Sequence, residues 1–159
     1  MGSNRIEIFY DSYHLDDIVE EDLRSQILST IAFADNAYAP YSKFKVSAII
    51  RLENGLLVKG ANVENASYPV SNCAERNVLS HTTTNYPKET IASICIYADK
   101  NLKKPVPPCG LCRQTLLEIE NRQDSPIKVY LVTKSKKIVE FHQAKDLLPF
   151  SFDATFLAE

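Results

Sequence analysis

Three cysteines and one glutamate stand in two short segments whose spacing suits a metal site. The first segment is Cys73-Ala74-Glu75-Arg76, and the second, Pro108-Cys109-Gly110-Leu111-Cys112-Arg113-Gln114, contains a Cys-x-x-Cys pair. Zn²⁺ takes four ligands, and a catalytic zinc site keeps one of these positions free for water. The three thiols therefore predict a zinc ion with an open position, and Glu75 is placed to move protons at that water. This arrangement indicates hydrolytic chemistry of the deaminating kind.

Both cysteine segments are predicted to begin helices. Helical patterns cover residues 73–81 and 109–121, and Asn72 is the expected N-cap of the first helix. In the first turn of a helix, unpaired N–H groups and the positive end of the helix dipole favour the thiolate form of cysteine. A mostly apolar strand over 91–98 separates the two helices and brings their N-termini to one edge of a sheet. Open α/β sheets bind ligands at such an edge.

Three thiolates on Zn²⁺ carry a net negative charge, so a neighbouring cation is expected. Arg76 follows Cys73 by almost one helical turn, and we expect it to donate a hydrogen bond to a ligand sulfur. Arg113 and Gln114, next to Cys112, are further candidates for this role. For both arginines the alternative is an ordinary position on a helix surface.

Hydrophobic periodicity and turn signals assign the remaining elements. They are a helix over 20–38 that Pro40 ends, strands over 44–51 and 56–62 joined by an Asn54-Gly55 turn, and strands over 127–133 and 138–141. Near the N-terminus, Ile6, Ile8 and Tyr10 alternate as in a short strand. This order predicts an α/β fold in which helices cover the faces of a mixed sheet.

Size and composition are those of a single globular domain. The chain has 159 residues, 45% of them hydrophobic and 24% charged, and a formal net charge of −2. We assign residues 1–19 to an N-terminal extension and residues 20–159 to a single catalytic domain. No basic stripe suggests nucleic-acid binding and no apolar run suggests a membrane span, so a small-molecule substrate is expected. Four cysteines without an export signal favour the cytoplasm.

The cysteines have a purely structural alternative, in which they are small buried hydrophobic residues. A Cys-x-x-Cys pair after two prolines, together with Cys-Ala-Glu, disfavours it for Cys73, Cys109 and Cys112. Cys95 lies between Ile94 and Ile96 in a predicted core strand, where the structural interpretation is preferred. Recruiting Cys95 as a fourth ligand would close the metal site and remove catalysis.

Five stretches in this order resemble the zinc-dependent cytidine deaminases of the small homotetrameric type, over roughly residues 23–153. They are Tyr38-Ala39-Pro40-Tyr41-Ser42-Lys43-Phe44, Asn62-Val63-Glu64-Asn65-Ala66-Ser67-Tyr68, the two cysteine segments, and Asp146-Leu147-Leu148-Pro149-Phe150-Ser151-Phe152. The resemblance implies a three-layer α/β/α fold with a five-stranded mixed sheet. One departure is Ser47, which stands where the family usually has glycine and puts close backbone packing there in question.

The resemblance also implies a role for each matched residue. It implies that one Zn²⁺ per subunit is bound by Cys73, Cys109 and Cys112, and that Glu75 shuttles protons. It implies that the ribose hydroxyls are bound by Asn62 and Glu64, that Phe44 packs near the pyrimidine and sugar, and that the Ala74 amide donates to the base carbonyl. It further implies a homotetramer in which a neighbouring subunit contributes Ala66, Tyr68 and Phe152 to the site. Independently of the resemblance, Asn62 and Glu64 alternate at a strand end and so point the same way. The alternative for Phe44, Tyr68 and Phe152 is core packing.

The expected reaction is hydrolysis of cytidine and 2′-deoxycytidine to uridine and 2′-deoxyuridine, with release of ammonia, by hydroxide generated at zinc. One alternative is a deaminase of a nucleoside antibiotic of the blasticidin type, or of a nucleotide. That group lacks the Asn-x-Glu pattern of Asn62 and Glu64. A polynucleotide editor is disfavoured, because such enzymes usually have His in place of Cys73. A non-catalytic zinc module is the alternative from another class, and it predicts a closed, four-ligand site.

Overall fold

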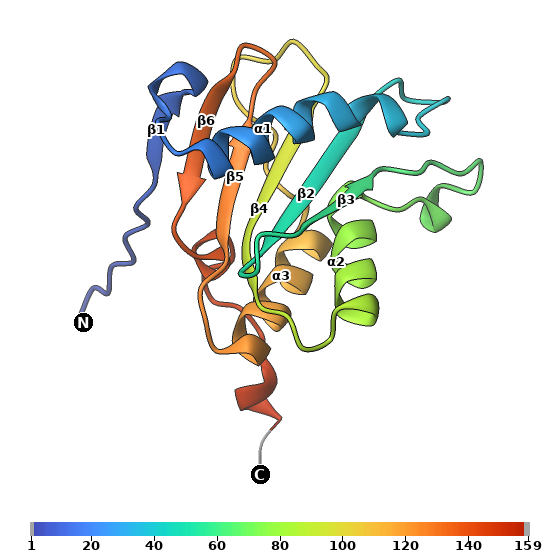
Figure 1. Ribbon diagram of the computed structural model, residues 1–159. Coiled ribbons are helices and arrows are strands. Elements are labelled where there is room, and N and C mark those ends of the chain that lie inside the picture. Colours follow the sequence, from blue (N-terminus) through green and yellow to red (C-terminus); the bar gives the residue numbers. More distant parts are fainter. Residues whose placement is uncertain (1, 158–159) are drawn as a thin grey trace.

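The computed structural model describes residues 2–157, which form three layers (Figure 1). Residues 1, 158 and 159, which belong to the predicted extension and domain, lie outside the described part. The strands are β1 (Asp11–His14), β2 (Val46–Leu52), β3 (Leu57–Ala61), β4 (Ile91–Ala98), β5 (Lys128–Val132) and β6 (Lys137–Phe141), and the helices are α1 (Glu21–Phe33), α2 (Ala74–Asn85) and α3 (Gly110–Gln123). Helix α1 covers one face of the sheet, and α2 and α3 cover the other. The predicted α/β/α fold is confirmed.

The sheet is mixed and has six strands rather than the expected five, in the order β1-β6-β5-β4-β2-β3. The additional strand is β1, which pairs antiparallel with β6 at the edge of the sheet. The strand predicted around Ile6 and Ile8 is wrong, because β1 begins at Asp11. Residue Leu15, directly after β1, is only 1% exposed, whereas Ile6 and Ile8 remain exposed. Burial against the sheet therefore decides where the strand lies, and local alternation does not.

The other predicted elements are present with shifted ends. Gly55 adopts a φ of +85°, which the Asn54-Gly55 turn between β2 and β3 requires. Helix α1 ends at Phe33 and continues as a short 3₁₀ turn over Ala34–Asn36, short of the predicted end at residue 38. Tyr38, at the predicted end of that helix, is 56% exposed and forms an isolated bridge with Val63 instead.

Two apolar cores lie on the two faces of the sheet. The core under α2 and α3 includes Val78 and Leu116, and the core under α1 includes Ile27 and Cys95. Cys95 is fully buried, which confirms its structural interpretation. Ser47 is also buried, and its hydroxyl donates a 2.5 Å hydrogen bond to the Thr30 carbonyl oxygen. Ser47 thus ties β2 to α1. Among residues 2–157, no helix combines the length and apolar character needed to cross a membrane.

The strand directions explain why α2 and α3 begin at one place. Strand β2 is antiparallel to both β3 and β4, so β3 and β4 run in the same direction. Helix α2 follows β3 and helix α3 follows β4 along the chain. Both helices therefore start on the same side of the sheet, beyond the carboxyl ends of β3 and β4, as the sequence predicted. The three cysteines lie at these helix starts.

Helix α2 lies directly against β3 at Gly60, and we expect Gly60→Ala to destabilise the fold. A Cβ at this position would lie 2.8 Å from Val78 Cβ and 2.9 Å from the Ala74 carbonyl oxygen. Because the obstacle is partly helix backbone, α2 must move, and the expected loss is about 1–3 kcal/mol. Urea unfolding of the wild type and the variant measures it. Gly110→Ala is the matched control, since a Cβ there meets no atom within 4 Å. Equal losses in both variants would contradict this packing argument.

Candidate metal centre and substrate pocket

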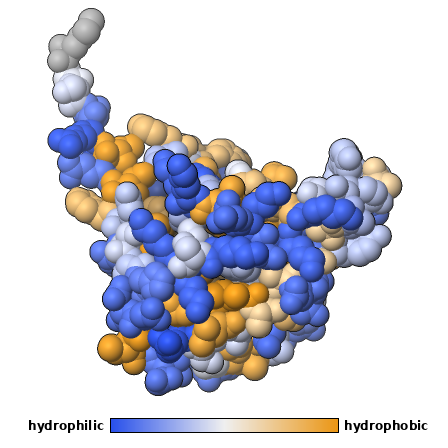
Figure 2. All heavy atoms as spheres, turned by 90° about the horizontal axis from the view of Figure 1, so that it is seen from above, coloured by the Kyte–Doolittle hydropathy of each residue, from blue (hydrophilic) through white to orange (hydrophobic). Residues whose placement is uncertain are grey.

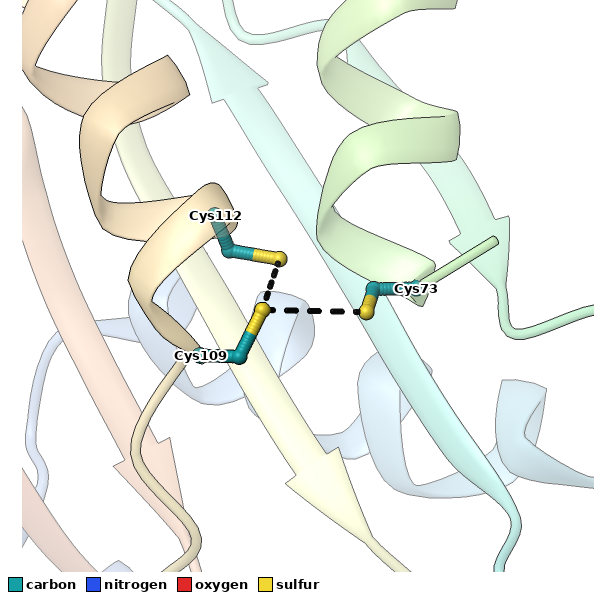
Figure 3. A group of neighbouring side chains, drawn as sticks. All are labelled: Cys73, Cys109 and Cys112. Carbon is teal, nitrogen blue, oxygen red and sulfur yellow. Dashed lines mark hydrogen bonds between the residues drawn. The ribbon is translucent and has the colours of Figure 1, made fainter. Parts of the chain in front are cut away.

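The three predicted ligand sulfurs converge at the starts of α2 and α3 (Figure 3). Cys73 is the N-cap of α2 in place of the expected Asn72, and Cys109 is the N-cap of α3. The Sγ atoms of Cys73 and Cys109 are 4.0 Å apart, and those of Cys109 and Cys112 are 3.5 Å apart. Tetrahedral zinc with Zn–S bonds of about 2.3 Å requires sulfurs about 3.8 Å apart. The sulfur spacing therefore fits a zinc ion without rearrangement of the backbone.

The sulfur cluster leaves a fourth coordination position without a protein ligand. Within the described residues, the group of His, Cys, Asp and Glu atoms that could hold a metal consists of Cys73, Cys109 and Cys112, which all lie within 4.8 Å of one another. Cys95 belongs to the core under α1, on the other face of the sheet. Three protein ligands and an open position are typical of a catalytic zinc site, whereas a structural site has four.

A cavity of about 630 Å³ opens above the cysteines. Its size is in the usual range for small-molecule sites. The predicted site residues that line it are Phe44, Asn62, Glu64, Tyr68, Cys73, Ala74, Glu75 and Cys109. Cys112 is fully buried behind them. One cavity thus joins the candidate metal centre to the residues expected to bind a nucleoside.

Glu75 lies in the first turn of α2 and faces this cavity, although it is only 5% exposed. Burial raises the pKa of its carboxyl above the usual value, and the charge of Cys73 acts in the same direction. A carboxyl group with a raised pKa holds a proton more readily than an ordinary glutamate, as a group that both accepts and releases protons must. Its position next to the sulfurs, outside the ligand group, suits a proton shuttle.

Comparison with known proteins agrees with this geometry. Residues 21–125 match the family model of the cytidine and deoxycytidylate deaminase zinc-binding region, a range that contains all three cysteines and Glu75. The chain belongs to this deaminase family. It is 39% identical to the cytidine deaminase of Halalkalibacterium halodurans over 133 residues, covering 84% of this chain and 96% of the relative. The cytidine deaminase of Mycoplasma pneumoniae is 37% identical over 108 residues, covering 67% of this chain and 77% of the relative.

Solved structures of the family share the fold. The crystal structure of the cytidine deaminase from Burkholderia pseudomallei superposes with a TM-score of 0.71 and 34% sequence identity, covering 80% of this chain and 97% of that one. The cytidine deaminase from Mycobacterium tuberculosis gives a TM-score of 0.64 at 26% identity, covering 84% and 99% of the two chains. Family and fold therefore rest on 77% to 99% of the length of these relatives.

The deaminase site favours the thiolate form of Cys73. A hydrogen bond from the Cys112 thiol lowers the pKa of Cys73 to about 6, and the hydrogen bond to Cys109 and the positive charge of Arg76 also lower it. Arg76 thus acts on Cys73 through its positive charge. The hydrogen bond from Arg76 to a ligand sulfur stays a prediction. Arg113 acts elsewhere, because its guanidinium donates to the carbonyl oxygens of Pro108 and Leu147 at 2.8 Å each. It fixes the segment that carries Cys109.

The remaining predicted residues differ in whether they reach the cavity. The Gln114 amide donates to the Phe152 carbonyl oxygen at 2.9 Å, so its hydrogen bond goes to the C-terminal segment. Tyr68 lines the cavity of its own chain and contacts Tyr41 at a ring-centroid distance of 6.3 Å. Ala66 and Phe152 are not among the lining residues, and Phe152 stacks on Phe156. For Ala66 and Phe152, a role at the site depends on a second subunit and stays a prediction.

Several residues of the site carry no clear signal in the sequence. Val106 and Pro107 line the cavity next to Cys109. Ser42 also lines it, together with Tyr41 and Phe44 of the same loop. Gly60 was also missed, although a glycine inside a strand is a known sign of close backbone approach. Ser42 offered a weaker signal, since a hydroxyl after Pro40 and Tyr41 is ordinary in a turn. Its partner is distant in sequence and appears only in the fold.

Proposed function

We propose that this protein is a zinc-dependent deaminase that hydrolyses cytidine and 2′-deoxycytidine to the corresponding uridines and ammonia. The observation that carries this proposal is the set of three thiols with one open metal position, next to the buried Glu75, at the base of a cavity of about 630 Å³. Its relatives over most of the chain are named cytidine deaminases. The substrate is therefore a small pyrimidine nucleoside rather than a nucleic acid.

Different residues of the chain have different roles in the proposed reaction. Zn²⁺ would be held by Cys73, Cys109 and Cys112. It would lower the pKa of a bound water, so that hydroxide, the nucleophile that attacks carbon, forms near neutral pH. Glu75 accepts the proton of that water and delivers it to N3 of the base, which makes C4 more electrophilic. After the hydroxide has added to C4, Glu75 would take the second proton from that oxygen and give it to the amine, so that the C–N bond breaks, ammonia leaves and a carbonyl forms at C4. The amide of Ala74, at the first position of α2, is free to donate to the base carbonyl.

Asn62 and Glu64 are proposed to bind the ribose. The Asn62 side chain donates to the Phe44 carbonyl oxygen at 2.9 Å and accepts from the Val46 amide at 2.8 Å. A carboxamide has two N–H donors and two lone pairs on oxygen, so one donor and one acceptor site remain for a ligand. Asn62 therefore fixes the backbone on both sides of Lys45, directly after Phe44, and still has hydrogen-bonding capacity toward a hydroxyl.

We expect Asn62→Ala to raise the KM for cytidine about tenfold or more, because one hydrogen bond to the ribose and the support of Phe44 are lost together. Steady-state kinetics with cytidine measures the change. Asn121→Ala, at an exposed position of α3, is the control. An unchanged KM in the Asn62 variant would remove this residue from the ribose site.

The proposal also covers the oligomeric state of the protein and the compartment in which it works. We infer a homotetramer in which Ala66 and Phe152 of one subunit contribute to a neighbouring pocket, while Tyr68 lines the cavity of its own subunit. The exposure of the Phe152 side chain, at 58%, supports such a contact. The free thiols of the metal site suit the reducing cytoplasm.

The direct test is turnover by the zinc-loaded protein, followed by the ultraviolet absorbance change when cytidine becomes uridine. Cytidine and 2′-deoxycytidine should both be converted, and blasticidin S should be a much poorer substrate. Efficient conversion of blasticidin S alone would identify an antibiotic deaminase. Absence of turnover in a zinc-loaded, folded sample would favour a non-catalytic zinc module.

A further inference from the structure

Two loops next to the cavity pack against each other and project from the body of the protein. They cover residues 37–45, before β2, and residues 62–72, between β3 and α2 (Figure 1). Seen from above, they form the lobe at the right of the molecule, which carries both hydrophilic and hydrophobic side chains (Figure 2). The Tyr38 amide donates to the Asn62 carbonyl oxygen at 3.0 Å, and the Glu64 amide donates to the Tyr38 carbonyl oxygen at 2.8 Å. The backbone thus fixes the two loops relative to each other.

The first loop curls around the carboxylate of Glu64. The amides of Tyr41 and Ser42 both donate to Glu64 Oε2, at 2.9 and 3.2 Å, and the Ser42 hydroxyl donates to Oε1. Lys43 follows with a φ of +56°, a left-handed conformation that is uncommon outside glycine. Successive amides that point to one oxygen in this way form an anion-binding nest. The hydrogen bond from Ser42 also keeps the pKa of the Glu64 carboxyl below its usual value.

We propose that Ser42 is a positioning residue for substrate binding, and that it acts by holding Glu64 in the orientation that accepts a ribose hydroxyl. The proposal rests on the assignment of Glu64 to the ribose under the proposed function. Ser42 also accepts a 3.0 Å hydrogen bond from the Phe44 amide. Its hydroxyl therefore joins Glu64 of one loop to Phe44 of the other.

Hydrogen-bond capacity explains why Glu64 can be held and still bind a ligand. A carboxylate offers about four acceptor positions on its two oxygens. The Tyr41 and Ser42 amides occupy Oε2, and the Ser42 hydroxyl occupies one position on Oε1. An acceptor position on Oε1 remains for a ribose hydroxyl. Without the Ser42 hydroxyl, Oε1 is free to rotate toward water, and binding must then fix this exposed side chain at a cost in entropy.

The test compares two ligands that differ only in the ribose hydroxyls, uridine and 2′,3′-dideoxyuridine. Isothermal titration calorimetry with the zinc-loaded protein measures their dissociation constants. Ser42→Ala should weaken uridine binding about tenfold and change 2′,3′-dideoxyuridine binding less than about twofold. Ser42→Thr, which keeps the hydroxyl, should recover the affinity for uridine. Ser25→Ala, at an exposed position of α1, is the matched control. In turnover of cytidine, the loss should appear in KM rather than in kcat.

A double-mutant cycle with Glu64→Gln separates an indirect role from direct contact with the ligand. If Ser42 acts through Glu64, adding Ser42→Ala to Glu64→Gln should weaken uridine binding by less than about twofold. A full tenfold additional loss, or an equal loss for both ligands in the single variant, would overturn the proposal. If Glu64→Gln weakens uridine binding but Ser42→Ala does not, the proposal fails while the ribose assignment stands. If the wild type does not distinguish uridine from 2′,3′-dideoxyuridine, the ribose assignment itself fails.

Discussion

Replacing Glu75 by glutamine is expected to lower kcat for cytidine about 10³-fold or more while the protein still folds and binds zinc. Glutamine keeps the size of the side chain but can no longer accept a proton from water or pass it to the base. Glu75 is buried and faces the cavity beside the sulfurs, yet it does not belong to the group that can hold the metal. Its loss should therefore affect proton transfer and leave the metal site intact.

Two measurements distinguish this role from a structural one. Zinc content and thermal unfolding should match the wild type within error, and only turnover should fall. Glu118→Gln, at an exposed position of α3, should leave kcat unchanged. If Glu75→Gln retains more than about a tenth of the wild-type kcat, Glu75 is not the proton shuttle.

Loss of one zinc ligand is expected to have an effect of similar size on activity and a second effect on stability. Cys109→Ser weakens the metal site, because a serine hydroxyl is not ionised at neutral pH and binds Zn²⁺ poorly. We expect zinc per subunit to fall from about one to below about a tenth, with turnover lost in proportion. Zinc bound only by the folded protein stabilises it, so the melting temperature should fall as well.

Cys95→Ala is the matched control for this variant. Cys95 is fully buried in the core under α1, so its truncation should cost about 1 kcal/mol in unfolding free energy. The zinc content should nevertheless stay at about one per subunit. Full zinc occupancy in the Cys109 variant, or zinc loss in the Cys95 variant, would contradict the assignment of the ligands.

The sequence was sufficient for the metal site because the relevant signals are local. The spacing of Cys109 and Cys112 places both thiols in one helical turn, and Cys73 precedes a second helix. The compact strand β4 between them is buried along nearly its whole length, as its apolar pattern predicted. Strand directions then bring both helix starts to one edge of the sheet.

Features that depend on tertiary contacts were not predicted. Strand β1 lies at Asp11–His14 because Leu15 finds a buried position beside β6, and nothing near Ile6 indicates this. The early end of α1 reflects pairing of Tyr38 with Val63, two residues that are distant in sequence. Likewise, the hydrogen bond from Ser42 to Glu64 joins two loops. In each case the partner is set by the fold and not by the neighbouring residues.

X-ray absorption spectroscopy at the zinc edge of the zinc-loaded protein distinguishes an open metal site from a closed one. We expect three sulfur neighbours at about 2.3 Å and one oxygen neighbour at about 2.0 Å, the latter from water. Four sulfur neighbours, or a nitrogen from a fourth side chain in place of the oxygen, would show a closed site. A closed site leaves no position for the attacking water and would contradict a hydrolytic deaminase.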